Sequence, residues 1–130
     1  MRFRQVHLDF HTSEAIKNIG KDFNAEEFKK ALILGHVDSI TLFSKCHHGW
    51  AYHPSKANEI HPGLDFDLLG EQIKAAHEIG VKTPVYLSSG LDEKYAKKHR
   101  DCVVRNRDES TTWASDFMSP GYHRICMNTP

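Results

Sequence analysis

An alternation of short apolar runs with helical patterns constrains the fold of this 130-residue chain more than any other feature. Strands are predicted over residues 5–10, 37–43 and 81–87, and a helical pattern follows each of them. Strands that alternate with helices build βαβ units and a parallel sheet. Right-handed crossovers then place the helices on the faces of that sheet. The predicted fold class is therefore α/β, built from parallel βαβ units.

Two of the predicted helices have clear start and stop signals. Asn24 is the predicted N-cap of the first helix, Glu27 completes a capping box, and Gly35 ends the helix. Asp67 begins the second helix and Gly80 ends it. Their apolar residues recur at helical spacing, so each helix is expected to pack one face on the sheet.

The last third of the chain carries weaker patterns. Pro84 lies inside the third predicted strand, which is therefore expected to be short or bulged. A short polar helix is predicted over residues 91–99 and a brief strand over 102–104. Residues 105–121 are predicted to be an irregular segment that leaves the sheet, and residues 123–128 to be an extended segment.

Chain length separates two architectures that share this element order. The first is a small doubly wound sheet, and the second is the amino-terminal portion of a (β/α)8 barrel. A whole barrel takes about 250 residues, with about 200 near the lower limit, so a barrel of this sequence would be partial. Residues 1–130 are expected to form a single, partial TIM-barrel domain of a longer protein.

Polar and titratable residues gather where the first two predicted strands end. In α/β proteins, sites lie at the carboxyl ends of parallel strands, so these side chains are expected to share one pocket. Alternate residues of a strand point to the same face, which unites the residues of the first strand. The candidate binding residues are His7, Asp9, His11, Lys45, His47, His48 and Trp50.

Adjacent side chains of the second cluster are not expected to act alike. His47 and His48 are neighbours in an extended segment, so they should diverge, with one entering the pocket and the other bracing a loop. Trp50 and Tyr52 could form a stacking platform for a sugar ring, and Tyr52 could equally be an apolar lid over the loop.

A metal site is the main chemical alternative. His7, Asp9 and His11 on one strand resemble metal-dependent hydrolases in outline, because zinc binds His nitrogen and carboxylate oxygen. However, no clear fourth ligand or outer shell accompanies them, and residues 46–48 lack the separated spacing of a structural zinc site. We therefore expect no metal and no cofactor.

Composition argues against several classes of partner. The chain holds 17 Lys and Arg and 17 Asp and Glu, so no basic excess favours nucleic acid. No run approaches the roughly 18 apolar residues of a membrane span. The three cysteines, Cys46, Cys102 and Cys126, cannot all pair, and residues 1–5 lack the apolar core of a signal peptide. Buried, reduced thiols in a cytoplasmic protein are expected.

Several stretches resemble a known family. Residues 4–13, 44–50, 67–72 and 125–130 look like the hypothetical glycosyl hydrolase 6 family. The segment Lys45-Cys46-His47-His48-Gly49-Trp50 is also similar to the Lys-His-His-Asp-Gly-Phe segment of α-L-fucosidases, except that Cys46 is interposed and no Asp precedes the glycine. The resemblance implies a TIM-barrel glycosidase whose paired histidines contact sugar hydroxyls.

Glycosidases use two carboxylates that flank the scissile bond, and the resemblance places the nucleophile on a later strand than this chain contains. Asp9 is the one strand-end carboxylate expected in the pocket, in a hydroxyl-binding role, whereas Asp92 and Glu93 are expected to supply charge at a helix start. The catalytic residues therefore remain unknown, and whether this chain alone is an enzyme stays open.

The favoured function is the amino-terminal part of a glycoside hydrolase that binds a carbohydrate substrate. A metal-dependent hydrolase on a TIM barrel is one alternative. A non-catalytic sugar-binding fragment is another, and its unpaired sheet edges would allow it to form a homo-oligomer.

Overall fold

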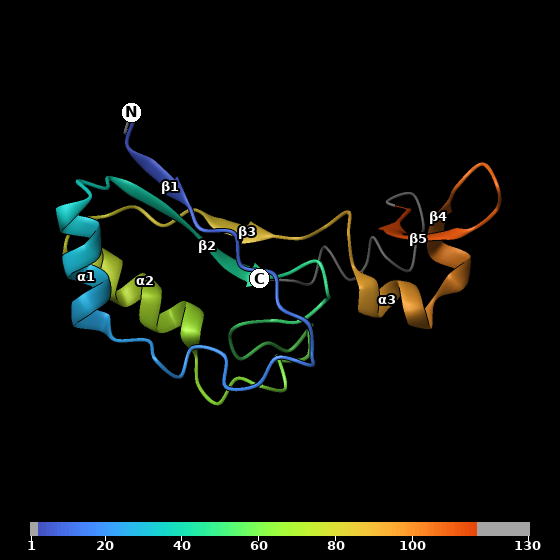
Figure 1. The fold of residues 1–130 in the computed structure, drawn as a ribbon, viewed down its shortest axis with the longest axis horizontal. Helices are drawn as coiled ribbons and strands as arrows, with labels where there is room; N and C mark the ends of the chain where they lie inside the picture. Colours follow the sequence, from blue (N-terminus) through green and yellow to red (C-terminus); the bar gives the residue numbers. More distant parts are fainter. Residues whose placement is uncertain (1–2, 117–130) are drawn as a thin grey trace.

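A parallel sheet forms the centre of this computed structural model, which describes residues 3–116 (Figure 1). β2 (Ser39–Lys45) lies between β1 (Gln5–His7) and β3 (Val85–Leu87), and both neighbours run parallel to it. The predicted adjacency of the first two strands, and their parallel direction, are therefore confirmed.

Two helices, α1 (Ala25–Leu34) and α2 (Leu68–Glu78), cover the same face of this sheet (Figure 1). Each begins as predicted, because the side chains of Asn24 and Asp67 accept backbone N–H groups of the first turn. Such caps typically contribute about 1 kcal/mol each. The chain leaves α2 through Gly80 with φ at +73°, a conformation that glycine adopts without strain.

The apolar core lies between β2 and these two helices. Successive residues of a strand face opposite ways, so alternate residues such as Ile40 and Leu42 present one face of β2 to the helices. The residues that pack together here are Leu32, Ile40, Leu42, Leu69, Ala76 and Val81.

The opposite face of the sheet carries an aromatic layer. The rings of Phe43 and Tyr86 stack with centroids 4.4 Å apart. The imidazoles of His7 and His11 meet the Phe43 ring edge-on, at 5.4 and 5.0 Å. Polar rings at the strand ends are therefore supported from below by apolar ones.

The strand bounds differ from prediction in ways that affect the site. β1 ends at His7 because the chain then turns away, and the Phe10 carbonyl accepts a hydrogen bond from the Tyr52 hydroxyl instead of continuing the ladder. β2 extends to Lys45, which places this lysine inside the sheet and not in the loop that follows. β3 is short, as Pro84 indicated, and begins directly after it.

The chain beyond β3 departs most from expectation. α3 (Glu93–Lys98) and a 3-10 turn (Arg100–Cys102) lead into β4 (Val103–Arg105). The predicted irregular excursion instead contains β5 (Thr111–Ser115), which pairs antiparallel with β4. The missed strand signal was the run Thr111-Thr112-Trp113, whose residue types are enriched in strands. The predicted segment at 123–128 lies outside the described residues.

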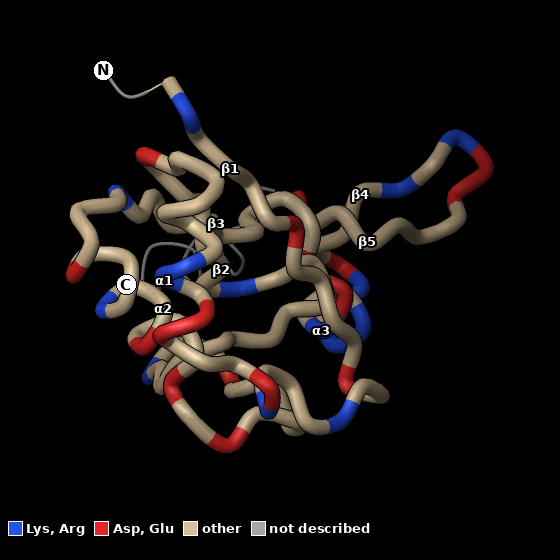
Figure 2. The backbone as a smooth tube through the Cα atoms, turned by 60° about the vertical axis from the view of Figure 1, so that its left-hand side comes forward, with Lys and Arg blue, Asp and Glu red and all other residues tan. Residues whose placement is uncertain are grey.

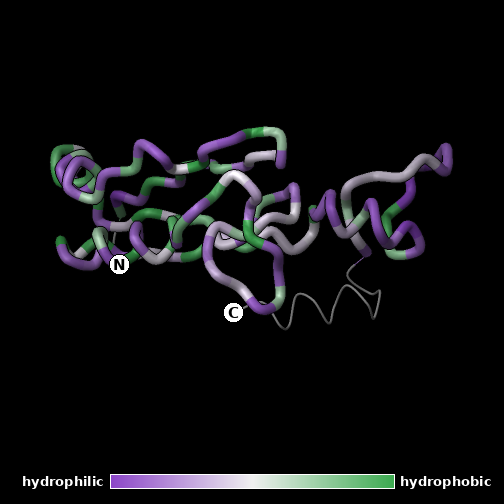
Figure 3. Tube along the Cα trace, turned by 90° about the horizontal axis from the view of Figure 1, so that it is seen from below, coloured by the Kyte–Doolittle hydropathy of each residue, from purple (hydrophilic) through white to green (hydrophobic). Residues whose placement is uncertain are grey.

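The third helix does not cover the sheet. α3 and the β4–β5 hairpin lie beyond the carboxyl end of β3 (Figure 1), and Val85 of β3 stays 48% exposed. The tip of the hairpin is hydrophilic (Figure 3), and both signs of charge are interspersed along the described chain (Figure 2). Among the described helices none is long and apolar enough to cross a membrane.

Candidate functional site

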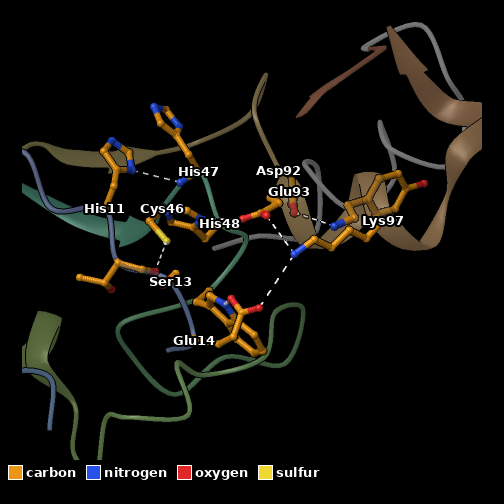
Figure 4. Close-up of polar contacts among 12 residues, drawn as sticks. His11, Ser13, Glu14, Cys46, His47, His48, Asp92, Glu93 and Lys97 are labelled. Atoms are coloured by element: carbon orange, nitrogen blue, oxygen red, sulfur yellow. Dashed lines mark hydrogen bonds and ion pairs between the residues drawn. The ribbon is translucent and has the colours of Figure 1, made fainter. Parts of the chain in front are cut away.

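Imidazole rings from two strand ends lie together at the carboxyl edge of the sheet (Figure 4). The rings of His11 and His47 stack with centroids 3.7 Å apart and planes 13° from parallel. The backbone N–H of His47 also donates to Nδ1 of His11 at 3.1 Å. The predicted meeting of the first two strand ends is therefore present in the structure.

Hydrogen bonding determines the tautomer of His11. Its Nδ1 accepts a backbone N–H, so in the neutral ring the proton must sit on Nε2. That Nε2 lies 3.0 Å from Oδ1 of Asp9 and donates to it. Burial, followed by the proximity of His47, lowers the pKa of His11, which favours the neutral ring.

His47 has the opposite tautomer. Its Nδ1 is 2.7 Å from Oγ of Ser88, and that hydroxyl already donates its single proton to the Leu91 carbonyl at 2.6 Å. The Tyr86 hydroxyl also lies near Nδ1, but at the longer distance of 3.4 Å, so Ser88 is the stronger partner and His47 donates to it through Nδ1. Nε2 of the neutral ring is then a hydrogen-bond acceptor. Burial is the largest cause that lowers the pKa of His47, and it keeps that acceptor unprotonated near neutral pH.

His48 is oriented in the same way by a different partner. Its Nδ1 lies 2.5 Å from Oε2 of Glu93, and an ionised carboxylate can only accept. The hydrogen bond from His48 and a second from Lys97 lower the pKa of Glu93, so the carboxylate stays ionised. His48 thus donates through Nδ1, and its neutral form offers Nε2 as an acceptor. The adjacent histidines diverge, as predicted, to separate partners.

A buried ion pair fixes the base of the site. Nζ of Lys45 lies 2.6 Å from Oδ2 of Asp92, and the two residues are 1% and 4% exposed. Oδ1 of Asp92 also accepts the Tyr95 N–H and so caps α3. The sequence placed Asp92 at a helix start, but gave no sign that it neutralises Lys45. Because Asp92 directly precedes Glu93, the pair also anchors the partner of His48.

The residues of the first predicted strand gather around Asp9 at the surface. Its carboxylate is 71% exposed, and Oδ1 of Asp9 lies 3.7 Å from Nε2 of His7. The His7, Asp9 and His11 set does not make a metal site. Among residues 3–116, no group of three or more His, Cys, Asp or Glu side chains is arranged to hold a metal ion.

The two aromatic residues of the long loop have different surroundings. Tyr52 is 1% exposed, and its hydroxyl bonds to Phe10 and Thr12, so of its two expected roles the stacking platform was wrong and the apolar packing role holds. Trp50 is partly exposed, donates from Nε1 to Glu14 at 3.3 Å, and has the Lys94 ammonium 4.2 Å from its ring centroid. One face of that indole is therefore already occupied by a cation.

Two hollows adjoin the histidine cluster. One of about 100 Å³ is lined by His48 and Trp50 together with charged residues of α3. Another of about 610 Å³ lies between residues 55–60 and α3, with Asp92 at its wall. His48 lines the smaller hollow, whereas His11 and His47 line neither of them.

The chain is similar to one protein family and to several solved structures. A family model described as hypothetical glycosyl hydrolase 6 matches residues 24–130, whereas no curated protein matches the chain. Alpha-L-fucosidase isoenzyme 2 from Paenibacillus thiaminolyticus is 54% identical with a TM-score of 0.88, over 98% of this chain and 21% of that chain. The chain belongs to the hypothetical glycosyl hydrolase 6 family, as its motifs predicted.

Two further structures share the fold over much of this chain. The Lactobacillus casei alpha-L-fucosidase in complex with alpha-L-fucose product is 25% identical with a TM-score of 0.51, over 85% of this chain and 34% of that one. The Thermotoga maritima alpha-L-fucosynthase is 20% identical with a TM-score of 0.56, over 90% and 24% respectively. This chain therefore spans between a fifth and about a third of the length of these three relatives.

Proposed function

We propose that this chain is the amino-terminal part of a (β/α)8 glycoside hydrolase that acts on α-L-fucosides. The sugar is suggested by the 54% identity to an α-L-fucosidase. The barrel is supported by the placement of α1 and α2 on one face of the sheet, since a doubly wound sheet carries helices on both faces. Residues 1–130 would be one part of a single barrel domain, whose later strands would cover the free edges of β1 and β3.

The observation that carries this proposal is the orientation of two imidazoles. His47 and His48 each donate through Nδ1, to Ser88 and Glu93, and each offers Nε2 as an acceptor. Sugar hydroxyls are donors that such acceptors can bind. A ring already oriented by a hydrogen bond loses little side-chain freedom when the sugar arrives. We assign His47 and His48 to hydroxyl binding, with His11 supporting His47 from below.

The remaining predicted residues have supporting roles in this proposal. Asp9 orients His11, His7 packs on the aromatic layer, Lys45 holds Asp92, and Trp50 borders the hollow beside His48. Neither Asp9 nor Glu93 is assigned to bond cleavage, because each is engaged by a histidine. The two carboxylates that glycoside hydrolysis requires would come from strands beyond this chain.

The location of the protein remains a proposal of the same kind. Cys46 is a buried free thiol, which suits a reducing compartment. We propose a cytoplasmic enzyme.

The test is hydrolysis of 4-nitrophenyl α-L-fucoside by protein expressed from the full reading frame that contains this chain. A lost hydrogen bond to the substrate costs about 1–3 kcal/mol, so His47→Ala and His48→Ala should each lower kcat/KM by roughly 5- to 150-fold. His77→Ala, an exposed histidine of α2, is the matched control. Folded protein that turns over no α-L-fucoside, or a His47→Ala variant that behaves like the control, would contradict the proposal.

A further inference from the structure

The β4–β5 hairpin is fastened to the site by its backbone. The N–H of Asp92 donates to the Trp113 carbonyl at 3.2 Å, and the N–H of Ser115 donates to the Gly90 carbonyl at 3.1 Å. An antiparallel bridge joins Leu91 to Ala114 between these bonds. β5 is therefore attached to the segment that begins α3. One of its contacts is Asp92, which directly precedes Glu93, the residue that orients His48.

This attachment puts an open indole beside the histidine. Trp113 is 51% exposed. Its ring centroid lies 5.5 Å from the ring centroid of His48, and the two ring planes are 50° apart. Trp50, by contrast, is held by Glu14 and covered on one face by Lys94. Of these two indoles, Trp113 has the larger surface available for an incoming molecule.

A half-exposed indole is a large apolar surface left in water on a strand of otherwise small residues. The C–H groups on one face of a pyranose carry partial positive charge and pack well on the negative face of an aromatic ring. The planes of Trp113 and His48 are 50° apart, so a sugar stacked flat on the indole would lie tilted against the imidazole plane in which the Nε2 lone pair points.

We propose that Trp113 is the stacking platform of a second subsite, which binds the sugar unit linked to the one that His47 and His48 hold. The hairpin would then determine which linked sugars are accepted. This inference depends on the proposed function, because the first subsite must hold the terminal sugar for the second to matter.

The experiment compares two ligands in protein from the full reading frame. The first is L-fucose, measured by its Ki as a competitive inhibitor, and the second is an α-L-fucosyl disaccharide, measured by kcat/KM. Loss of one aromatic stacking contact in Trp113→Ala should lower kcat/KM for the disaccharide about tenfold, and the Ki of L-fucose should change less than twofold. Trp113→Phe keeps a planar ring and should retain most activity, whereas Trp113→Leu should resemble Trp113→Ala.

Val104→Ala, an exposed apolar residue of β4, is the control for the fold of the hairpin. If His47→Ala weakens L-fucose inhibition while Trp113→Ala leaves disaccharide hydrolysis unchanged, the second subsite is wrong and the proposed function stands. An equal loss for both ligands in Trp113→Ala and Trp113→Leu would also overturn it, by indicating a general structural role. If the wild-type protein neither hydrolyses the disaccharide nor is inhibited by L-fucose, both proposals fail.

Discussion

Two regions of this molecule are held together by different physical means. The sheet with α1 and α2 is organised around a continuous apolar cluster that includes Ile40, which is fully buried. The region of α3 and the hairpin has fewer buried apolar residues, and it is joined to the sheet by the Lys45–Asp92 pair. The histidine cluster lies at the seam, since His47 and His48 come from the first region and their partners Ser88 and Glu93 lie at or beyond the end of β3.

This difference teaches how the site is oriented. The apolar core places the strand ends, but it does not choose which nitrogen of each imidazole carries the proton. That choice is made by partners supplied at the edge of the polar region. Changes confined to the polar region should therefore alter the chemistry of the site while the sheet remains intact.

The largest expected effect comes from breaking the joint itself. Lys45→Met would leave the Asp92 carboxylate buried without its ammonium partner, which costs about 3–5 kcal/mol of unfolding free energy. Urea unfolding measures the loss. Hydrogen exchange should show the amides of α3 and the hairpin becoming less protected than those of β2 and α2.

Arg4→Met is the matched control, because it removes a cation from the exposed Arg4–Asp38 pair and should change stability far less. The double variant Lys45→Met, Asp92→Leu should regain part of the stability, since two apolar residues leave no charge buried. If the single variant is as stable as the control, or if protection falls equally across the sheet, the proposed division into two regions is wrong.

Sequence patterns predicted the apolar region better than the polar one, for a physical reason. Caps such as Asn24 and Asp67, and the periodic apolar residues between them, act over a few residues and can be recognised locally. The Lys45–Asp92 and His48–Glu93 contacts join residues 47 and 45 positions apart. No local pattern encodes such a pairing, so the sequence predicted for Glu93 only a charge at the start of a helix.

Composition of the strand ends did predict which residues would gather there. His11 and His47 meet as expected, because parallel strands bring their carboxyl ends to one edge. What the sequence could not predict was exposure: Asp9 was expected inside the pocket and lies largely in solvent, whereas Lys45 and Tyr52 are buried. Ser88 was also missed, although Ser88-Ser89-Gly90 after β3 was a visible turn signal.

A smaller effect is expected from pH. Burial lowers the pKa of His11 and of His47 in the folded state, with Asp9 and His48 as the charged or titratable neighbours of both. Below the unfolded value of about 6.5, the unfolded chain binds protons that the folded rings resist, so unfolding free energy should fall as pH decreases from 6.5. Above that value both states are neutral at these positions, and the dependence should vanish.

Urea unfolding between pH 5 and pH 8 tests this sign. His47→Gln should flatten the decline below pH 6.5, whereas the exposed control His77→Gln should leave it unchanged. Sugar binding should fall in the same direction, because a protonated Nε2 can no longer accept a hydroxyl proton. A wild-type stability that rises on acidification from pH 6.5 to 5 would contradict the assignment of both rings as neutral.

The smallest effect should come from exchanging one atom at the seam. Glu93→Gln keeps the size of the side chain that faces His48, but the amide can donate as well as accept, and it no longer attracts a proton to Nδ1 of the ring. A fraction of His48 would then adopt the other tautomer and present Nε2–H to the sugar in place of an acceptor. We expect about a fivefold fall in kcat/KM, equivalent to roughly 1 kcal/mol, with little change in the exchange protection of the sheet.

Nitrogen-15 NMR of the imidazole identifies the tautomer directly, and Glu59→Gln, which removes a surface carboxylate paired with Lys94, is the control. If His48 keeps its proton on Nδ1 in Glu93→Gln and kcat/KM still falls, the carboxylate acts through its charge and not through the choice of tautomer.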